Sequence, residues 1–197
     1  MCRFVESIKL KDGVFYRLKL HQERVNKAFA ACYPTECPFS IFENLNQSVI
    51  PQEGTYKCRI VYDEDVKLFE FVPYERREIN SLKLVETDLE SSAYKLEDRT
   101  GFNAAFTQRG DCDDVLLVKN GLLTDTSYCN IALYDGENWI TPHIPLLYGV
   151  NRAELLAQGK LIEKDIPAEY LKNYQKIALF NAMIEFGEMV LDIDKIF

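Results

Sequence analysis

The stretch DVLLVKNGLLTDTSYCNIALYDGENWITP, residues 114–142, decides the fold of this 197-residue chain. It contains two turn signals, Asn120-Gly121 and Asp135-Gly136, between apolar runs, and such dipeptides are typical of tight turns between antiparallel strands. The stretch therefore predicts a three-stranded antiparallel meander. After it, GVNRAELLAQG at residues 149–159 places one glycine directly before an amphipathic segment and another at its end, which predicts a helix.

Outside this stretch the chain alternates between helix and strand signals. An opening hairpin over residues 4–20 leads to a helix over residues 21–33, where apolar residues recur at helical spacing. Further helices are expected at 37–51, 97–110 and 167–175. Further strands are expected at 54–65, 66–75, 81–87, 160–166 and 176–183, and the segment 188–197 ends the chain. This mixture predicts an α+β fold, with a smaller lobe at residues 1–85 and a larger lobe at residues 86–197.

Composition argues against several classes of protein. The formal net charge is −8, whereas a general nucleic-acid binder needs clustered Lys and Arg to neutralise phosphates. No apolar run approaches the ~20 residues of a membrane span, and the N-terminus lacks the apolar core of a signal peptide, so we expect a cytoplasmic protein. The six cysteines are scattered without a CxxC pair and the chain has two histidines, so neither a disulfide framework nor a metal site is expected.

Lys95, in AYKLEDR at residues 93–99, has two interpretations. As an ordinary surface lysine it would be a solvated charge. As a nucleophile that forms a Schiff base it would need a lowered pKa, which partial burial or a nearby cation supplies. Arg99, about one helical turn further on, could supply that cation. The heptapeptide alone does not decide between the two interpretations.

Three other features also allow both a structural and a chemical interpretation. Asp125 falls within an expected strand, where a carboxylate is costly unless it is hydrogen-bonded or paired; it is either a turn aspartate bonded to its own backbone or a group that holds a proton on a heteroaromatic nitrogen. The helix start after Gly149 directs the N–H groups of Val150 and Asn151 outward, as helix N-termini do when they bind phosphate. Arg24, in the first turn of its helix, is either an exposed arginine or a phosphate ligand.

A lysine, a carboxylate, an arginine and a helix N-terminus together meet the needs of pyridoxal phosphate. The lysine forms the imine, the carboxylate keeps the pyridine nitrogen protonated so that the ring accepts electrons, and the arginine and helix end hold the phosphate. The combination is more specific than any one of its members.

Four segments of the chain carry a recognisable family pattern. Residues 121–156 match, in order and spacing, G-x-(V/I)-T-E-x-x-x-x-N-(I/L)-F…G-x-(I/L)-x-T-P…L-x-G-(I/V)-T-R. KLEDR at residues 95–99, LKLHQERVNKAF at 18–29 and ALFNAM at 178–183 match further elements of the same pattern. Together they resemble the class-IV aminotransferases, the fold-type IV pyridoxal phosphate enzymes that include branched-chain and D-amino-acid aminotransferases and aminodeoxychorismate lyase. The resemblance implies a two-lobed, D-amino-acid aminotransferase-like fold that is shortened at its N-terminus.

The resemblance also implies roles for the reacting groups. Lys95 would be the catalytic Schiff-base lysine and the proton shuttle. Asp125 would face the pyridine nitrogen, although the family pattern has a glutamate there, which is one methylene longer. Arg59, on a strand of the smaller lobe, would bind the substrate carboxylate.

The phosphate-binding residues implied by the resemblance come from three segments. They are Arg24, the backbone N–H groups of Val150 and Asn151, and Asn181 or Ala182 near the same phosphate. Asn151 and Ala182 stand where hydroxyl residues are common in the family, which predicts a weaker hold on the phosphate.

Three functions follow from the resemblance. The first is an aminodeoxychorismate lyase-like enzyme that releases pyruvate and 4-aminobenzoate, a folate precursor, because KLEDR is closer to the K-x-L-N-R element of the lyases than to that of the branched-chain transaminases. The second is an amino-acid transaminase of branched-chain or D-amino-acid type. The third is a family member that binds the cofactor without catalysis. The family builds its sites at a dimer interface, so the resemblance also implies a homodimer acting on a small-molecule amino-group substrate.

Overall fold

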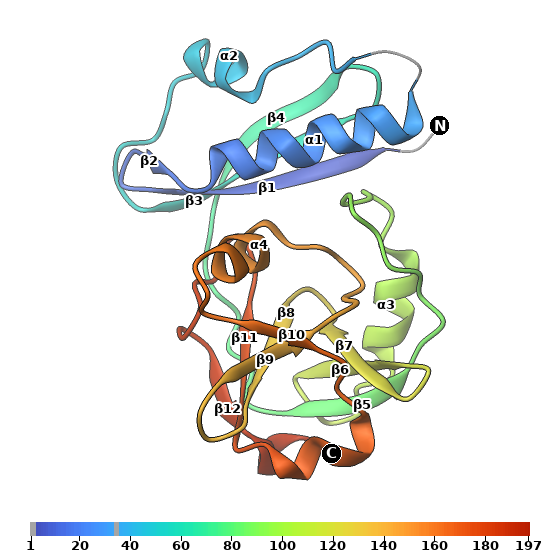
Figure 1. Cartoon of the computed structure of the whole chain (residues 1–197). Coiled ribbons are helices and arrows are strands. Elements are labelled where there is room, and N and C mark those ends of the chain that lie inside the picture. Colours follow the sequence, from blue (N-terminus) through green and yellow to red (C-terminus); the bar gives the residue numbers. More distant parts are fainter. Residues whose placement is uncertain (1–2, 34–35) are drawn as a thin grey trace. The chain divides into compact units, whose positions relative to one another are not determined.

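The computed structural model describes residues 3–33 and 36–197, so Cys2, one of the six cysteines, lies outside the described residues (Figure 1). The chain divides into two compact units. The first unit contains the described residues up to Arg76 and the short segment Ala93–Asp98, and the second unit contains Arg77–Ser92 and Arg99–Phe197. The division expected at residue 85 assigned Lys95 to the larger lobe, whereas its segment belongs to the first unit. Across the described residues, no helix has both the length and the apolar character needed to cross a membrane.

The first unit is a four-stranded antiparallel sheet with a long helix packed on one face (Figure 1). Its elements are β1 (Phe4–Lys11), β2 (Val14–Phe15), α1 (Leu18–Cys32), α2 (Ile41–Asn46), β3 (Thr55–Tyr62) and β4 (Val66–Pro73). The strands follow the order β2-β1-β3-β4. Alternate side chains of β1 and β3, among them Phe4, Ile8 and Ile60, pack with Val25 and Phe29 of α1, because successive side chains of a strand point to opposite faces.

The N-terminal hairpin and the helices after it differ from the sequence prediction. β2 has two residues, and α1 begins at Leu18 rather than at His21. The chain turns at Arg17, whose φ of 57° is left-handed, and Leu18 then packs against the apolar core. Burial of the helix face has therefore outweighed the strand propensity of the apolar residues before it. α2 is also shorter than the expected helix at 37–51.

The second unit is built on an eight-stranded sheet. Its strands are β5 (Leu82–Glu86), β6 (Asp114–Lys119), β7 (Leu122–Thr126), β8 (Asn130–Tyr134), β9 (Trp139–Pro142), β10 (Ile162–Lys164), β11 (Lys176–Phe180) and β12 (Val190–Asp192). Its helices are α3 (Thr100–Thr107), α4 (Val150–Ala157) and the 3-10 helices η1 (Ala168–Asn173) and η2 (Ile193–Lys195). The strands follow the order β10-β9-β8-β7-β6-β5, and β11 pairs with β8 and β12. The pairs β5–β6 and β9–β10 are parallel and the other pairs are antiparallel, so the predicted α+β class is confirmed.

The meander predicted for residues 114–142 has four strands instead of three. The chain is interrupted after β7, where the N–H groups of Tyr128 and Cys129 donate to Oγ1 of Thr126. β8 then returns antiparallel to β7 and sets Asn130 opposite Asp125. The interruption therefore brings Asn130 of β8 beside Asp125, the candidate acidic residue.

Candidate active site

Lys95 lies in an irregular segment that runs along the free edge of β1. The N–H of Val5 donates to the Lys95 carbonyl at 2.9 Å, and the N–H of Glu97 donates to the carbonyl of Arg3 at 2.8 Å. The side chain is half-buried, and its Nζ donates to Oγ of Ser7 on β1 at 3.0 Å. The backbone of Lys95 is therefore held on both sides, and its amine has a fixed neighbour, which argues against a freely solvated surface lysine.

Arg59 lies on the same face of the sheet as Ser7, because the two residues are direct partners in the β1–β3 pairing. Its guanidinium is bound to two carboxylates, with Nη1 at 3.2 Å from Glu70 and Nη2 at 3.2 Å from Glu97. All three side chains are about one third exposed, so these ion pairs exchange readily with solvent or with another carboxylate.

Arg24 is buried on the inner face of α1 and not exposed, which excludes the surface interpretation. Its Nε donates to Oε1 of Glu6 at 2.8 Å and its Nη2 to Oε2 at 2.6 Å. Burial would raise the pKa of Glu6, but Arg24 and then His21 outweigh it and lower that pKa to about 2. Glu6 is not among the site residues predicted from the sequence, although an acid between Phe4 and Ile8 on the apolar face of a strand indicates a buried cation as its partner.

His21 completes this buried group. Its Nδ1 lies 2.5 Å from Oε2 of Glu6, and its Nε2 is buried without a hydrogen-bond partner among the described residues. Burial lowers the pKa of His21, Glu6 opposes this, and the charges of Arg24 and Lys95 lower it further. His21 is therefore neutral at neutral pH, with the proton on Nδ1 and a lone pair on Nε2.

Asp125, on β7, is buried, and each of its two carboxylate oxygens accepts a hydrogen bond from the protein. Its Oδ1 accepts from Nδ2 of Asn130 at 2.9 Å, and its Oδ2 accepts from the N–H of Leu147 at 2.8 Å. Burial raises the pKa of Asp125 to about 6, against the effect of these donors. The carboxylate is thus bonded to the neighbouring strand and to the loop before α4, not to its own backbone as the turn interpretation required.

Gly149 allows the helix start to approach Asn130, the donor to Asp125, closely. A Cβ at Gly149 would lie 2.0 Å from Oδ1 of Asn130, so no other residue fits there without a shift. The first intrahelical hydrogen bond of α4 runs from the N–H of Ala153 to the carbonyl of Gly149. The N–H groups of Val150 and Asn151 precede it and have no acceptor within the helix, as at every α-helix N-terminus, and anion binding there stays a prediction.

Asn151 joins the start of α4 to the turn at residues 181–184. Its buried Nδ2 donates to the carbonyls of Asn181 at 2.8 Å and Ile184 at 3.1 Å, while its Oδ1 has no hydrogen-bond partner among the described residues. Asn181 fixes the same turn by accepting from the N–H of Met183 at 2.8 Å and of Ile184 at 3.0 Å. The side chain of Asn151 therefore links the start of α4 to the turn that contains Asn181 and Ala182.

The candidate residues thus form two groups, one in each unit. The first holds Lys95, Arg24 and Arg59, and the second holds Asp125 with Val150, Asn151, Asn181 and Ala182. Within the described ranges, no set of three or more His, Cys, Asp or Glu side chains is arranged to hold a metal ion.

Comparison with known proteins identifies the family. The family model described as amino-transferase class IV matches residues 98–189. An uncharacterized protein of Haemophilus influenzae is 31% identical over 180 residues, which cover 90% of this chain and 96% of that protein. The crystal structure of a candidate 4-amino-4-deoxychorismate lyase from Haemophilus somnus is 31% identical, covers 94% of this chain and 98% of that chain, and has a TM-score of 0.85. The chain belongs to the class IV aminotransferase family, as the sequence predicted.

A more distant structure carries the cofactor. A hypothetical aminotransferase from Mycobacterium tuberculosis in its PLP-bound form has a TM-score of 0.75 and 15% identity, and covers 94% of this chain and 79% of that chain. It shares the fold with this chain, and the cofactor it binds is the one that the sequence predicted.

Proposed function

We propose that this chain is a pyridoxal phosphate-dependent enzyme acting on a small amino-group substrate, with Lys95 as its catalytic residue. The observation that carries the proposal is the fixed, half-buried Lys95, whose backbone is held on the edge of β1 and whose Nζ is bonded to Ser7. When bound, pyridoxal phosphate supplies a ring that accepts the electrons released at the substrate carbon.

Each unit, taken by itself, has donor groups that suit this cofactor. The first-turn N–H groups of α4 suit a phosphate, because they lack acceptors within the helix and lie at its positive end. Arg24 uses Nε and Nη2 on Glu6, which leaves Nη1 and its two hydrogens to bind a phosphate oxygen. Oδ1 of Asn151 is an acceptor and suits a protonated phosphate oxygen or a bridging water better than a bare oxyanion.

Asp125 would hold the proton on the pyridine nitrogen. Each of its oxygens accepts one hydrogen bond from the protein, and a carboxylate oxygen has a second lone pair available. The bonds to Asn130 and Leu147 orient the aspartate side chain, which is one methylene shorter than the glutamate of the family pattern, so that the carboxylate has one preferred position. Its role requires the ionised form, because only a negative charge stabilises the protonated ring nitrogen.

Lys95 would take a proton from the substrate carbon at Nζ and return it, and the hydroxyl of Ser7 would orient the amine for that transfer. Arg59 would bind the substrate carboxylate by exchanging Glu70 or Glu97 for it. Glu97 lies two residues after Lys95, so this exchange would occur next to the reacting amine.

The reaction that we favour is elimination of pyruvate from 4-amino-4-deoxychorismate, which leaves 4-aminobenzoate for folate synthesis. It is supported by the KLEDR element and by the likeness to the Haemophilus somnus protein over nearly the full length of both chains. The second candidate is an amino-acid transaminase, favoured by the name of the Mycobacterium structure. The third is a cofactor-binding protein without turnover. By analogy with the family we also expect a homodimer.

Absorption spectroscopy with added pyridoxal phosphate tests the proposal first. The wild-type protein should show a visible band that borohydride fixes, with the label found by mass spectrometry on Lys95, and Lys95→Ala should show neither. Release of pyruvate and 4-aminobenzoate, as opposed to amino-group transfer to a 2-oxo acid, then separates the lyase from the transaminase. A labelled protein with neither activity would support the third candidate, and the absence of any label would overturn the proposal.

A further inference from the structure

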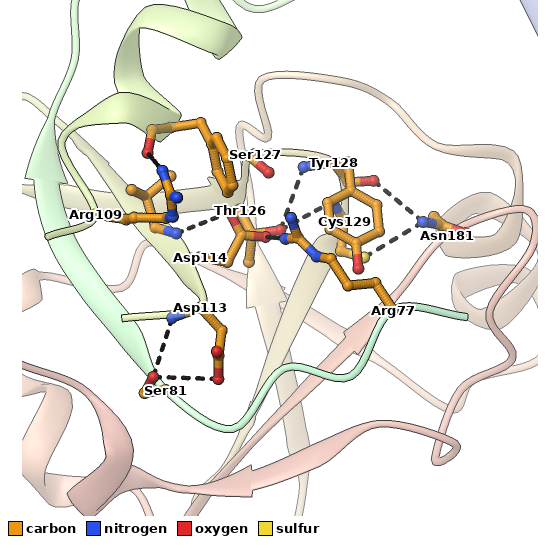
Figure 2. Close-up of polar contacts among 12 residues, drawn as sticks. Arg77, Ser81, Arg109, Asp113, Asp114, Thr126, Ser127, Tyr128, Cys129 and Asn181 are labelled. Atoms are coloured by element: carbon orange, nitrogen blue, oxygen red, sulfur yellow. Dashed lines mark hydrogen bonds and ion pairs between the residues drawn. The ribbon is translucent and has the colours of Figure 1, made fainter. Parts of the chain in front are cut away.

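The side chain of Asn181, a predicted phosphate-binding residue, is already fully engaged within the protein. Asn181 follows β11 directly, and its Oδ1 accepts from the N–H groups of Met183 at 2.8 Å and Ile184 at 3.0 Å. Its Nδ2 carries two hydrogens and donates to the carbonyl of Tyr128 at 3.2 Å and to Sγ of Cys129 at 3.3 Å (Figure 2). A phosphate would therefore have to displace one of these acceptors to receive a hydrogen bond from this side chain.

The backbone of Asn181 is held as well. Its N–H donates to the carbonyl of Ile184 at 3.1 Å, and its own carbonyl accepts from Nδ2 of Asn151 at 2.8 Å. Asn151 lies in the first turn of α4, whose N–H groups are the proposed phosphate donors. The backbone of Asn181 is thus bonded to the proposed phosphate site, whereas its side chain reaches another part of the same unit.

That other part is the interruption between β7 and β8. The N–H of Thr126 donates to the carbonyl of Cys129 at 2.9 Å, and Oγ1 of Thr126 accepts from the N–H of Cys129 at 3.0 Å. Both residues are buried. The last residue pair between β11 and β8 is Phe180 with Asn130. The side chain of Asn181 therefore continues this pairing by one step, where the pairing of the backbones ends.

Asn130 continues the connection to the candidate acidic residue. It follows Cys129 in the chain, and its Nδ2 donates to Oδ1 of Asp125 at 2.9 Å and to the carbonyl of Leu147 at 2.8 Å. The N–H of Leu147 donates in turn to Oδ2 of Asp125 at 2.8 Å. A continuous path of printed sequence and hydrogen bonds thus joins Asn181 to Asp125, and all of it lies in the second unit.

We propose that Asn181 is a positioning residue, which fixes the turn at residues 181–184 and, through Asn151, the start of α4 relative to the carboxylate of Asp125. The inference rests on the proposed function, in which the turn and α4 hold the phosphate of the cofactor and Asp125 holds its ring nitrogen. Asn181 uses its side chain on the protein and not on the cofactor. A fixed spacing matters because one rigid molecule must satisfy both ends at once.

Separate binding of the two halves of the cofactor tests this inference. The variant is Asn181→Ser in a Lys95→Ala background, where no covalent bond to the lysine forms. Serine can keep the turn by accepting from the N–H groups that follow, but it is too short to reach Tyr128 and Cys129. Inorganic phosphate, followed by phosphorus NMR, and pyridoxal, followed by fluorescence, should each bind within about threefold of the Lys95→Ala parent. Pyridoxal phosphate should bind about tenfold or more weakly, since small misplacements have effects of this size.

Asp135→Ser is the matched control in the same background. Asp135 forms the same kind of turn, because its Oδ1 accepts from the N–H groups of Glu137 at 2.9 Å and Asn138 at 2.7 Å, but it is exposed between β8 and β9. All three ligands should bind this variant within about twofold of the parent. If Asn181→Ser does not fold, Asn181→Thr tests the same link, because its hydroxyl also suits the turn and is also too short for the bridge.

The pattern of the three affinities separates positioning from general damage. Equal weakening of phosphate, pyridoxal and pyridoxal phosphate would overturn the inference, and so would binding of pyridoxal phosphate to Asn181→Ser within about twofold of the parent. A wild-type protein that takes no borohydride-fixable label on Lys95 would refute the catalytic role of that lysine, while a selective loss of pyridoxal phosphate binding in Asn181→Ser would still support the inference. Failure of both the wild type and the parent to bind pyridoxal phosphate would refute the proposed function and the inference together.

Discussion

Removing the charge of Glu6 should reveal how strongly the buried group at Arg24 stabilises the first unit. In Glu6→Gln the side chain keeps its shape and one acceptor oxygen, while Arg24, 6% exposed, loses its counter-charge. The pKa of Glu6 is lowered from its usual 4.5 to about 2, because Arg24 and His21 outweigh burial. At about 1.4 kcal/mol for each pH unit, the ionised form contributes about 3 kcal/mol to the free energy of unfolding at pH 7. Breaking a buried ion pair costs about the same, ~3–5 kcal/mol.

The pH dependence gives this prediction its sign. The folded state binds the proton of Glu6 less readily than the unfolded state, so the contribution is complete above about pH 4.5 and is lost as the pH falls toward 2. By pH 3, roughly half or less of the 3 kcal/mol should remain. Urea unfolding of wild type and Glu6→Gln at pH 7 and pH 3 measures the contribution of Glu6 to the free energy of unfolding at each pH.

Glu70→Gln is the matched control for Glu6→Gln. Glu70 pairs with Arg59 but is 40% exposed, so its loss should change stability by no more than about 0.5 kcal/mol. A difference in the free energy of unfolding between wild type and Glu6→Gln below about 1 kcal/mol at pH 7 would refute the reasoning, because a buried pair of this geometry costs more to break. The same difference at pH 7 and pH 3 would refute it as well, because the contribution of an ionised Glu6 must shrink as the pH falls.

Three further predictions concern the second unit. In the cofactor-free protein burial raises the pKa of Asp125 to about 6, and the proposed role requires the ionised form. The affinity for pyridoxal phosphate should therefore fall as the pH drops below about 6, and an affinity that is flat from about pH 5 to 8 would contradict this. Gly149→Ala should lower the free energy of unfolding by about 1–3 kcal/mol, because the added Cβ would lie 2.0 Å from Oδ1 of Asn130. Denaturant unfolding measures this loss. A variant that unfolds at the wild-type midpoint would contradict the prediction, because the loop would then have moved without cost. Asn151→Leu should lower the free energy of unfolding by about 1–3 kcal/mol, because it leaves the carbonyls of Asn181 and Ile184 without their donor. It should also weaken the binding of pyridoxal phosphate, as measured by fluorescence titration. A wild-type affinity would contradict the role of this link between α4 and the turn.

Local patterns in the sequence were sufficient for much of the fold. The two Asn-Gly and Asp-Gly turns predicted the strands around them, and the glycine before an amphipathic segment predicted the start of α4 at Val150. The order of motifs predicted the family, which the matching relatives confirm. These features depend on neighbours a few residues apart, and hydrophobic period and turn chemistry act over that range.

Other features depended on contacts that no local pattern contains. The break between β7 and β8 and the start of α1 at Leu18 were missed, because tertiary burial and side-chain bonds decided them. The partners of the buried charges were also missed: Glu6 with Arg24, and Asp114 with Arg77.

The difference has a single physical reason. By itself the sequence predicted most of the strands and helices and the family to which the chain belongs. Only the tertiary structure decided which carboxylate compensates which cation, since a buried charge takes its partner from whichever element packs against it, and in Glu6 and Arg24 that partner lies 18 residues away.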